Sequence, residues 1–316
     1  MKVLLWHLHG SWTTAFVRGR HEYVVPVTPE RGPYGRGRAR TWDWPPNLVE
    51  LPPDALEREP FDAVILQRPE EEDLAKRWLR GRPGRDIPLI YVEHDAPQAR
   101  ISEMRHPMAD RSDVALVHVT SFNALFWDAG TTPQRVIEHG IVDPGYQYTG
   151  ELERAAVVIN EPIRRWRVTG TDLLAALADV IPVDLFGLGA HAAARVLPVH
   201  GMGNLTQTAL HREMARRRVY VHPVRWTSLG LSLIEAMQLG MPVVALATTA
   251  VPGSVPAEAG VVSNDPVAIA AALRRLRGDP EEARRIGKAG RAYALERFGL
   301  DRFLDDWDRL LKEVTA

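Results

Sequence analysis

The sequence predicts an α/β protein with two domains, each built on a parallel sheet with helices on both faces. Short apolar segments alternate with helical segments in both halves of the chain, which is the pattern of a doubly wound sheet. The composition, 45% hydrophobic and 25% charged, is that of a globular protein. A length of 316 residues is sufficient for two separate hydrophobic cores.

The first half of the chain contains strands and helices in alternation. We expect strands at residues 2–8, 23–27, 61–67, 88–93, 114–119 and 135–138. Helices are expected at residues 13–18, 71–79 and 121–128. Residues 28–53 interrupt the alternation, because they are rich in Gly and Pro and carry Arg31, Arg36, Arg38, Arg40, Trp42 and Trp44. We expect a long loop there that is mobile until a ligand binds.

The second half repeats the alternation after a linker expected at residues 143–150. We expect strands at residues 155–159, 183–186, 219–222, 243–246 and 257–262. Helices are expected at residues 170–179, 207–217, 266–277, 280–298 and 301–312, and the last of these is amphipathic. The predicted boundaries are 1–145 for the first domain, 146–298 for the second domain and 299–316 for a terminal helix.

Composition and charge exclude several classes of function. The formal net charge of −1 provides no basic field for nucleic acid. The chain has no cysteine and its histidines are dispersed, so we expect neither a metal site nor a cofactor. No apolar run approaches the roughly 18 residues of a spanning helix, and the N-terminus is predicted to be a strand rather than a signal peptide. A soluble cytoplasmic protein is therefore expected.

The most informative segment runs from residue 219 to residue 246, VYVHPVRWTSLGLSLIEAMQLGMPVVAL. It is typical of a strand, a loop, a helix, a tight turn and a second strand. Pro223 ends the first strand, Ser228 can cap the helix, and Gly230 lets backbone approach a bound group. The N-terminus of a helix favours phosphate, and the single carboxylate inside this helix, Glu235, suits a ribose diol. The segment therefore indicates half of a nucleoside-diphosphate site.

The part SLGLSLIEAMQLGMPVVAL resembles the donor-site signature of glycosyltransferase family 4, retaining enzymes with the GT-B fold. The resemblance implies two Rossmann-like domains that face each other across a cleft, and a last helix that crosses back to the first domain. Glu235 matches the family's ribose-binding Glu, and Leu229, Gly230 and Leu231 match the segment whose backbone meets the sugar and the diphosphate. The family's other Glu, which contacts the transferred sugar, is replaced by Thr227.

Two loops of the first domain are candidates for the same site. Gly10 and Ser11 follow the first strand, at the edge where parallel sheets bind ligands. The alternative is that Ser11 only caps a helix and that His9 is a solvated loop residue. His94 ends another strand, and the resemblance places a His there near the transferred sugar; the alternative is a surface His paired with Asp95. His118 alternates with apolar residues and is expected to be buried and hydrogen-bonded.

The resemblance also points to a basic loop in the second domain. Family members carry an Arg just after the first strand of this domain and a Lys just before a Gly, and both cations clamp the diphosphate. Thr169 occupies the Lys position, whereas Arg164, Arg165 and Arg167 can supply positive charge. Arg164 has the spacing of the family's Arg. The alternative is that these arginines form a solvated basic loop without a ligand.

Two further positions complete the candidate donor site. Gly187 belongs to a Gly-x-Gly turn after a strand, which is weak evidence alone, and in the family this turn borders the base pocket. His222 ends the strand before the signature and can line the sugar pocket. Glu258, in the loop after the signature, is expected to be structural.

The predicted function is transfer of a sugar from a nucleoside-diphosphate donor to a hydroxyl acceptor, with retention and without a metal. The resemblance assigns catalytic roles to His94, Arg164 and Thr227, with the donor on the second domain and the acceptor on the first. Many relatives act on lipid-linked acceptors, so peripheral membrane contact remains open. The alternative is a nucleotide- or glycan-binding protein that has lost transfer, which Thr169 and Thr227 suggest. A nucleotide-sugar epimerase lacks support from the signature.

Overall fold

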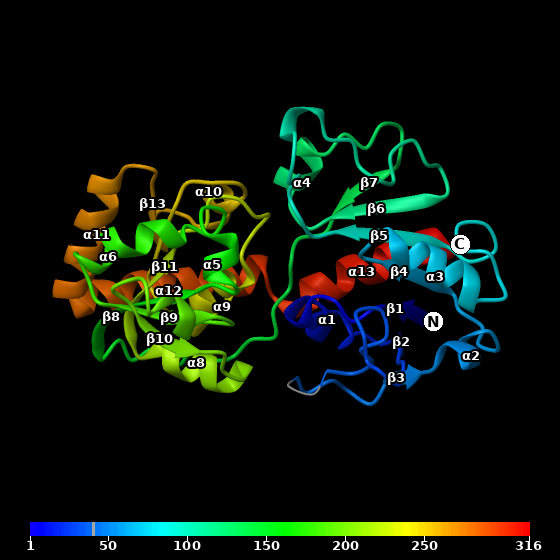
Figure 1. Ribbon diagram of the computed structural model, residues 1–316, viewed down its shortest axis with the longest axis horizontal. Coiled ribbons are helices and arrows are strands. Elements are labelled where there is room, and N and C mark those ends of the chain that lie inside the picture. Colours follow the sequence, from blue (N-terminus) through cyan, green and yellow to red (C-terminus); the bar gives the residue numbers. More distant parts are fainter. Residues whose placement is uncertain (40–41) are drawn as a thin grey trace. The chain divides into compact units, whose positions relative to one another are not determined.

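The computed structural model describes residues 1–39 and 42–316, and it divides into two compact units (Figure 1). Unit 1 comprises Met1–Val142 together with Leu300–Ala316, and unit 2 comprises Asp143–Gly299. Unit 2 is therefore inserted in the sequence between two parts of unit 1. Arg40, expected in the basic loop, lies outside the described residues. Among the described residues, no helix is long and apolar enough to cross a membrane.

Unit 1 contains a seven-stranded parallel sheet with the strand order β3-β2-β1-β4-β5-β6-β7. The strands are β1 (Lys2–Leu5), β2 (Glu22–Pro26), β3 (Leu48–Leu51), β4 (Ala63–Leu66), β5 (Leu89–Glu93), β6 (Val114–His118) and β7 (Gln134–Val136). The helices are α1 (Gly10–Phe16), α2 (Pro53–Leu56), α3 (Glu70–Trp78), the 3₁₀ helix η1 (Ile101–Glu103), α4 (Ser121–Phe126) and α13 (Leu300–Thr315). The strand pairs of this sheet among the described residues are parallel, so the carboxyl ends of its strands share one edge.

Alternate residues of the central strands point to opposite faces of this sheet, which gives unit 1 two cores. One core contains Val3, Leu5 and Ile65 and is covered by α1 and α13. The other contains Leu4, Val64 and Leu66 and is covered by α2 and α3. Both faces are apolar because β4 and β5 are buried along their whole length.

Helix α13 completes the core of unit 1 from the far end of the sequence, and Figure 1 shows it beside the sheet. Its amphipathic pattern buries one stripe of side chains: Phe303, Trp307, Leu310 and Leu311. Trp307 packs edge-on against Trp12 and Phe16 of α1, with ring centroids 5.7 and 5.0 Å away. The terminal helix expected at residues 299–316 thus packs on the first unit.

Unit 2 contains a six-stranded parallel sheet with the strand order β10-β9-β8-β11-β12-β13. The strands are β8 (Leu152–Val158), β9 (Val183–Phe186), β10 (His200–Gly203), β11 (Arg217–His222), β12 (Val243–Ala245) and β13 (Gly260–Val262). The helices are α5 (Pro162–Arg165), η2 (Thr171–Leu173), α6 (Leu174–Ala178), α7 (Ala190–Ala193), α8 (Gln207–Ala215), α9 (Leu231–Leu239), α10 (Val251–Ser254), α11 (Pro266–Gly278) and α12 (Pro280–Arg297).

The structure differs from the sequence-based expectations at several elements. Residues 28–53 are not all loop, because β3 pairs with β2 at the sheet edge. Strand β10 was not predicted either, since its sequence HGMG lacks β-branched residues. Ser228 does not cap the signature helix: α9 begins at Leu231 with Gly230 at the N-cap position. The helix expected at residues 170–179 is divided into η2 and α6.

Candidate functional site

In open parallel sheets, ligands bind at the carboxyl ends of the strands. In unit 1 this edge carries three histidines that are far apart in the sequence: His9 follows β1, His94 follows β5 and His139 follows β7. The ring centroids of His9 and His94 are 4.1 Å apart. Those of His94 and His139 are 6.4 Å apart, and the two rings are nearly parallel. Trp12 of α1 meets His94 edge-on at 5.2 Å.

Neighbouring polar groups determine which nitrogen of His94 carries the proton. The Nε2 of Gln67 donates to the carbonyl oxygen of Trp6 at 2.7 Å, so the amide oxygen of Gln67 faces His94. The Nε2 of His94 therefore donates to this oxygen at 2.9 Å. In the neutral ring, Nδ1 is then the hydrogen-bond acceptor. Sequence reasoning missed Gln67, because no local pattern connects it to His94.

Burial keeps this group of histidines uncharged. The pKa of His94 lies well below its usual value because of burial and the neighbouring His9 and His139. Burial lowers the pKa of His139 to about 3. The pKa of His9 is also lowered by burial, although Asp95 opposes this shift. The edge thus presents neutral imidazoles, which can exchange hydrogen bonds with hydroxyl groups.

His94 is 8% exposed and bound to Gln67, so the alternative of a surface histidine paired with Asp95 is wrong. His9 is likewise half-buried rather than solvated. His118 is buried, and its Nε2 lies 2.9 Å from the amide oxygen of Gln134, as its alternation with apolar residues predicts. His118 ends β6 at the same edge of the sheet, but its ring packs on His106 rather than with the group formed by His9, His94 and His139.

Gly10 and Ser11 lie at the start of α1. The helix begins at Gly10, and His9 occupies the N-cap position without a side-chain cap bond. Ser11 is thus inside the first turn, and the alternative that it is only a cap is wrong. The indole of Trp42 packs against Gly10, where an added Cβ would be 2.7 Å from Nε1. The described part of the basic 28–53 segment therefore covers the loop after β1.

In unit 2, the corresponding edge carries the arginine loop, residues 161–172, after β8. Arg164 is exposed and pairs with Glu161, whose pKa it holds below the usual value. Arg167 is also exposed, and its Nη1 lies 3.1 Å from Oδ2 of Asp172. Arg165 is half-buried, and among the described residues no ion pair of its side chain is found. Arg164, the residue with the family spacing, thus has a carboxylate partner of its own.

Thr169 and Thr227 differ in their surroundings. Thr169 is 2% exposed, and its hydroxyl lies 3.0 Å from the hydroxyl of Thr171. Gly170, at φ +70°, packs so closely on the carbonyl of Pro223 that an added Cβ would be 1.9 Å from the oxygen. Thr227 is half-buried in the signature loop, residues 223–230. Thr169 is therefore a structural residue in the protein, whereas Thr227 remains accessible.

The start of α9 is lined by a buried polar chain. The hydroxyl of Tyr220 lies 2.9 Å from the hydroxyl of Ser232 and 3.3 Å from Nδ1 of His222. His222 packs beneath Gly230, and burial lowers its pKa to about 4. Leu229 is buried, while Gly230 and Leu231 are half-buried at the N-terminus of the helix. The N-terminus of α9 thus follows the carboxyl end of β11 across the signature loop.

Glu235 lies in the second turn of α9 and is 4% exposed. Its Oε2 is 3.5 Å from Nε2 of His211, which belongs to α8. His211 also lies 2.6 Å from Nε2 of Gln207. Gly187 follows β9 with φ +116°, a conformation that glycine adopts readily. Sequence reasoning missed His211, because it lies on α8, which is separated from α9 by β11, and no local pattern connects it to Glu235.

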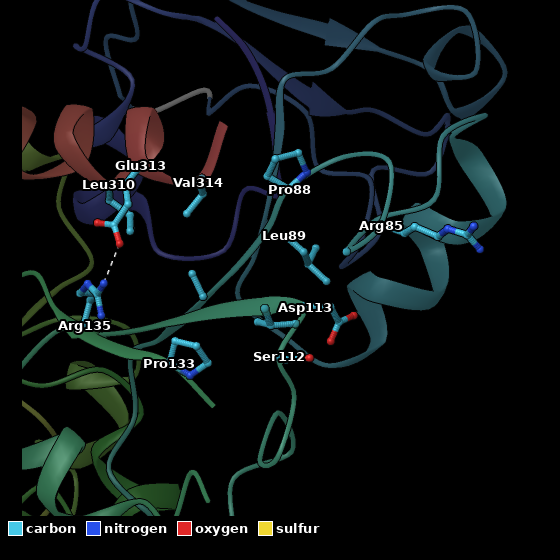
Figure 2. A pocket seen from close by; sticks show the side chains of 13 residues that line it. Arg85, Pro88, Leu89, Ser112, Asp113, Pro133, Arg135, Leu310, Glu313 and Val314 are labelled. Atoms are coloured by element: carbon cyan, nitrogen blue, oxygen red, sulfur yellow. Dashed lines mark hydrogen bonds and ion pairs between the residues drawn. The ribbon is translucent and has the colours of Figure 1, made fainter. Parts of the chain in front are cut away.

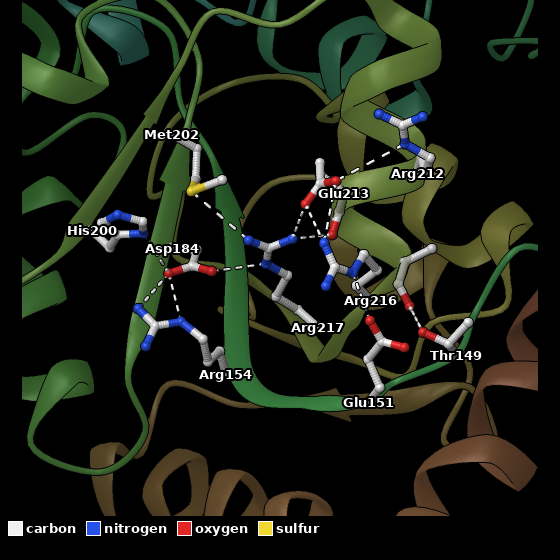
Figure 3. Close-up of polar contacts among 11 residues, drawn as sticks. Thr149, Glu151, Arg154, Asp184, His200, Met202, Arg212, Glu213, Arg216 and Arg217 are labelled. Carbon is white, nitrogen blue, oxygen red and sulfur yellow. Dashed lines mark hydrogen bonds and ion pairs between the residues drawn. The ribbon is translucent and has the colours of Figure 1, made fainter.

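Two hollows lie away from these edges, at the amino ends of the strands. The first, about 390 Å³, is lined by Leu89, Val114 and Leu310 of unit 1, and Figure 2 shows Arg135 bonded to Glu313 at its rim. The second, about 420 Å³, is lined by Arg154, Asp184 and Arg217 of unit 2, and Figure 3 shows the contacts of the Asp184 carboxylate with both arginines. Arg217 donates to this carboxylate at 2.8 Å. Among the described residues, no group of acidic, His or Cys side chains could hold a metal ion.

Comparisons with known proteins agree with this geometry. A family model described as glycosyl transferases group 1 matches residues 193–293, which contain the signature loop and α9. No curated protein matches the chain in sequence. Among solved structures, sucrose-phosphate synthase from Thermosynechococcus elongatus has a TM-score of 0.73 at 15% identity, covering 99% of this chain and 98% of that chain.

Two further structures extend over the same length. The HepE protein of Anabaena in complex with UDP-glucose has a TM-score of 0.68 at 15% identity, covering 99% of this chain and 100% of that chain. A glycosyltransferase from Rickettsia africae has a TM-score of 0.67 at 12% identity, covering 99% and 98%. At such identities, the likeness shows the fold alone. The protein therefore has the two-sheet α/β fold of the GT-B glycosyltransferases, and the prediction of its fold class is confirmed.

Proposed function

We propose that the protein transfers a sugar from a nucleoside-diphosphate sugar to a hydroxyl acceptor, with retention of configuration and without a metal ion. The observation that carries this proposal is the arrangement around α9 in the segment that matches the glycosyltransferase model. A half-buried helix start, a nearby loop with Arg164, Arg165 and Arg167, and a carboxylate in the second turn are the groups that a nucleoside diphosphate requires.

In this proposal, unit 2 binds the donor. The diphosphate contacts the first turn of α9 and the arginine loop, with Arg165 as the principal cation because Arg164 pairs with Glu161 and Arg167 pairs with Asp172. Glu235 accepts hydrogen bonds from the ribose hydroxyls, and Gly187 borders the base. His222 and Thr227 line the sugar pocket. UDP is the first nucleotide to test, because solved structures of HepE contain UDP and UDP-glucose.

Unit 1 supplies the acceptor side, with Gly10, Ser11 and His94 near the transferred sugar. The bond between the sugar and the phosphate oxygen breaks, and a bond from the sugar to the acceptor oxygen forms. The acceptor proton passes to the departing phosphate oxygen, so the atoms balance. The neutral Nδ1 of His94 accepts a hydrogen bond from a sugar hydroxyl and orients it. Holding both substrates and neutralising the diphosphate lower the barrier.

A second candidate is a nucleotide- or glycan-binding protein without transferase activity. The observation in its favour is that Thr169 is turned inward and Thr227 carries no charge, so both charged groups of the family pattern are missing. The two candidates are distinguished by incubating the protein with UDP-, GDP- and ADP-sugars, with EDTA present, and measuring free nucleotide and glycosylated product. Melting shifts with UDP, GDP or ADP but no turnover of any donor would favour the binding protein.

A further inference from the structure

The arginine loop and the signature loop are fastened to each other within unit 2. The backbone N–H groups of Arg225 and Trp226 both donate to the carbonyl oxygen of Val168, at 2.9 and 3.1 Å. The guanidinium of Arg225 donates to the carbonyl oxygen of Arg167 at 2.9 Å. The same guanidinium makes a two-pronged contact with Asp172, at 2.5 and 2.9 Å.

The pair formed by Arg225 and Asp172 is the strongest of these contacts. The two side chains are only 27% and 20% exposed, so solvent screens their interaction less than that of a surface pair. A bidentate arginine–carboxylate contact also fixes direction as well as distance. The hydrogen bond from Arg225 holds the pKa of Asp172 below its usual value, so the carboxylate stays charged. The pair therefore determines how the two loops lie against each other.

The position of this pair relates to the two departures from the family pattern. The resemblance places a Lys at residue 169 in the arginine loop and a Glu at residue 227 in the signature loop, but both positions are Thr. The acidic residue Asp172 lies three residues after Thr169. The basic residue Arg225 lies two residues before Thr227. The arginine loop thus contributes an acid and the signature loop contributes a base, and these two charges pair with each other.

We propose that Arg225 is a positioning residue that, through Asp172, sets the spacing between the arginine loop and the signature loop for the donor. This inference rests on the proposed function. Arg225 acts through the backbone of residues 226–230 rather than by touching the donor, because the carbonyl of Arg167 and both carboxylate oxygens of Asp172 already hold its two terminal nitrogens in place. Asp172 also pairs with the exposed Arg167, so the same carboxylate connects the signature loop to an arginine of the arginine loop.

The test compares R225Q, D172N and the double variant R225Q/D172N, with UDP binding measured by calorimetry. Because either single change breaks the same contact, we expect each to weaken UDP binding about tenfold and the double variant to be no weaker than the singles. R225K keeps the charge but loses the two-pronged contact, so it should also weaken binding. R216Q is the matched control, since Arg216 pairs with Glu151 elsewhere in unit 2 (Figure 3).

Direct binding of the donor by Arg225 predicts a different result. D172N would then free the guanidinium and leave UDP affinity unchanged or increased, while R225K would bind like the wild type. Either outcome overturns the proposal. Lower melting temperatures with unchanged UDP affinity would also overturn it, because they indicate a merely structural pair. Thr227→Glu adds a carboxylate that competes for Arg225, so we expect weaker UDP binding and slower transfer; a gain in transfer contradicts the proposal.

Hydrogen exchange of the unliganded protein separates this inference from the proposed function. Both D172N and R225Q should increase amide exchange in residues 166–172 and 223–230, and R216Q should not. Unchanged exchange in these residues overturns the positioning role whatever the protein binds. A wild-type protein that binds none of UDP, GDP and ADP, yet shows the expected exchange, contradicts the proposed function and leaves the contact between the loops established.

Discussion

The ligand edges of the two units carry polar side chains that differ in charge. The edge of unit 1 carries buried histidines whose pKa values are lowered by burial, so its polar groups are neutral. The edge of unit 2 carries exposed arginines with carboxylate partners, such as Arg164 with Glu161 and Arg167 with Asp172. Neutral imidazoles suit hydroxyl groups, whereas guanidinium groups suit phosphate. The difference shows that two sheets of the same type, each considered by itself, can carry neutral groups at one ligand edge and charged groups at the other.

The largest expected effect is that of acidification, which should lower the stability of unit 1 more than that of unit 2. A histidine with a lowered pKa in the folded state stays neutral there but becomes protonated in the unfolded chain below about pH 6.5. The contribution of such a histidine to the free energy of unfolding is complete above pH 6.5 and is lost as the pH falls toward the pKa of the folded state. For His139, with a pKa of about 3, this contribution falls by about 3 kcal/mol by pH 4.

Unit 1 holds several such histidines, including His9, His94 and His118, whereas His222 is the corresponding residue of unit 2. We therefore expect unit 1 to lose hydrogen-exchange protection before unit 2 between pH 7 and pH 4.5. Replacing His139 by Gln should make the pH dependence shallower. Simultaneous loss of protection in both units would contradict the interpretation that the histidines of unit 1 make it the more acid-sensitive unit.

Removing the positive charge of unit 2 should weaken donor binding. A variant with Arg164, Arg165 and Arg167 changed to Ala loses charge-assisted contacts worth about 1.5–3 kcal/mol each when they are made. Because Arg164 is bonded to Glu161, we expect a total loss in UDP affinity of about 100-fold rather than the full sum. Calorimetry measures this value. An affinity equal to that of the wild type would show that the loop is only a solvated basic segment.

The role of Glu235 can be tested with a nucleotide that lacks the two ribose hydroxyls. If its carboxylate binds the diol, Glu235→Gln should weaken UDP binding about tenfold but leave the affinity for 2′,3′-dideoxy-UDP nearly unchanged. The variant should keep its fold, since a Gln at this position still reaches His211. A variant that melts much lower and still distinguishes the two nucleotides would show that Glu235 is structural.

The smallest expected effect belongs to His94. Changing it to Asn keeps a polar group near Gln67 but removes the acceptor Nδ1, so kcat should fall about tenfold with little change in donor KM. Gln67→Glu provides a second measurement. The new carboxylate favours protonated His94 and so raises its pKa. Activity should therefore begin to fall on acidification at a higher pH than it does in the wild type. Equal losses of kcat and donor affinity would instead place His94 in the ground-state donor pocket.

Local sequence patterns predicted most of the fold but only part of the site. Residues 219–246 were readable because Pro223 and the Gly after the helix mark the ends of elements. The short edge strands β3 and β10 were not: β3 (LVEL) has four residues between prolines, and β10 (HGMG) contains a single apolar side chain, Met202. Both the boundaries and the existence of such strands depend on pairing with a neighbour.

The partners within the site depend on contacts across long stretches of sequence. His9 and His139 are brought to His94 by three different strands of one sheet, and Gln67 reaches it from a fourth. Arg225 and Asp172 are 53 residues apart, and no periodicity links them. Sequence alone indicated the candidate residues on each loop, but the tautomer of His94 and the pairing of the two loops follow only from the packed structure.

The return of α13 to unit 1 has a consequence for synthesis. As the chain leaves the ribosome, residues 1–142 emerge first, but the apolar face meant for Phe303 and Trp307 has no cover until residues 300–316 are made. Unit 2, which is continuous from Asp143 to Gly299, can reach its final structure earlier. The first unit to be translated is therefore the last to be finished, and a nascent chain paused before Leu300 exposes a hydrophobic surface that chaperones bind.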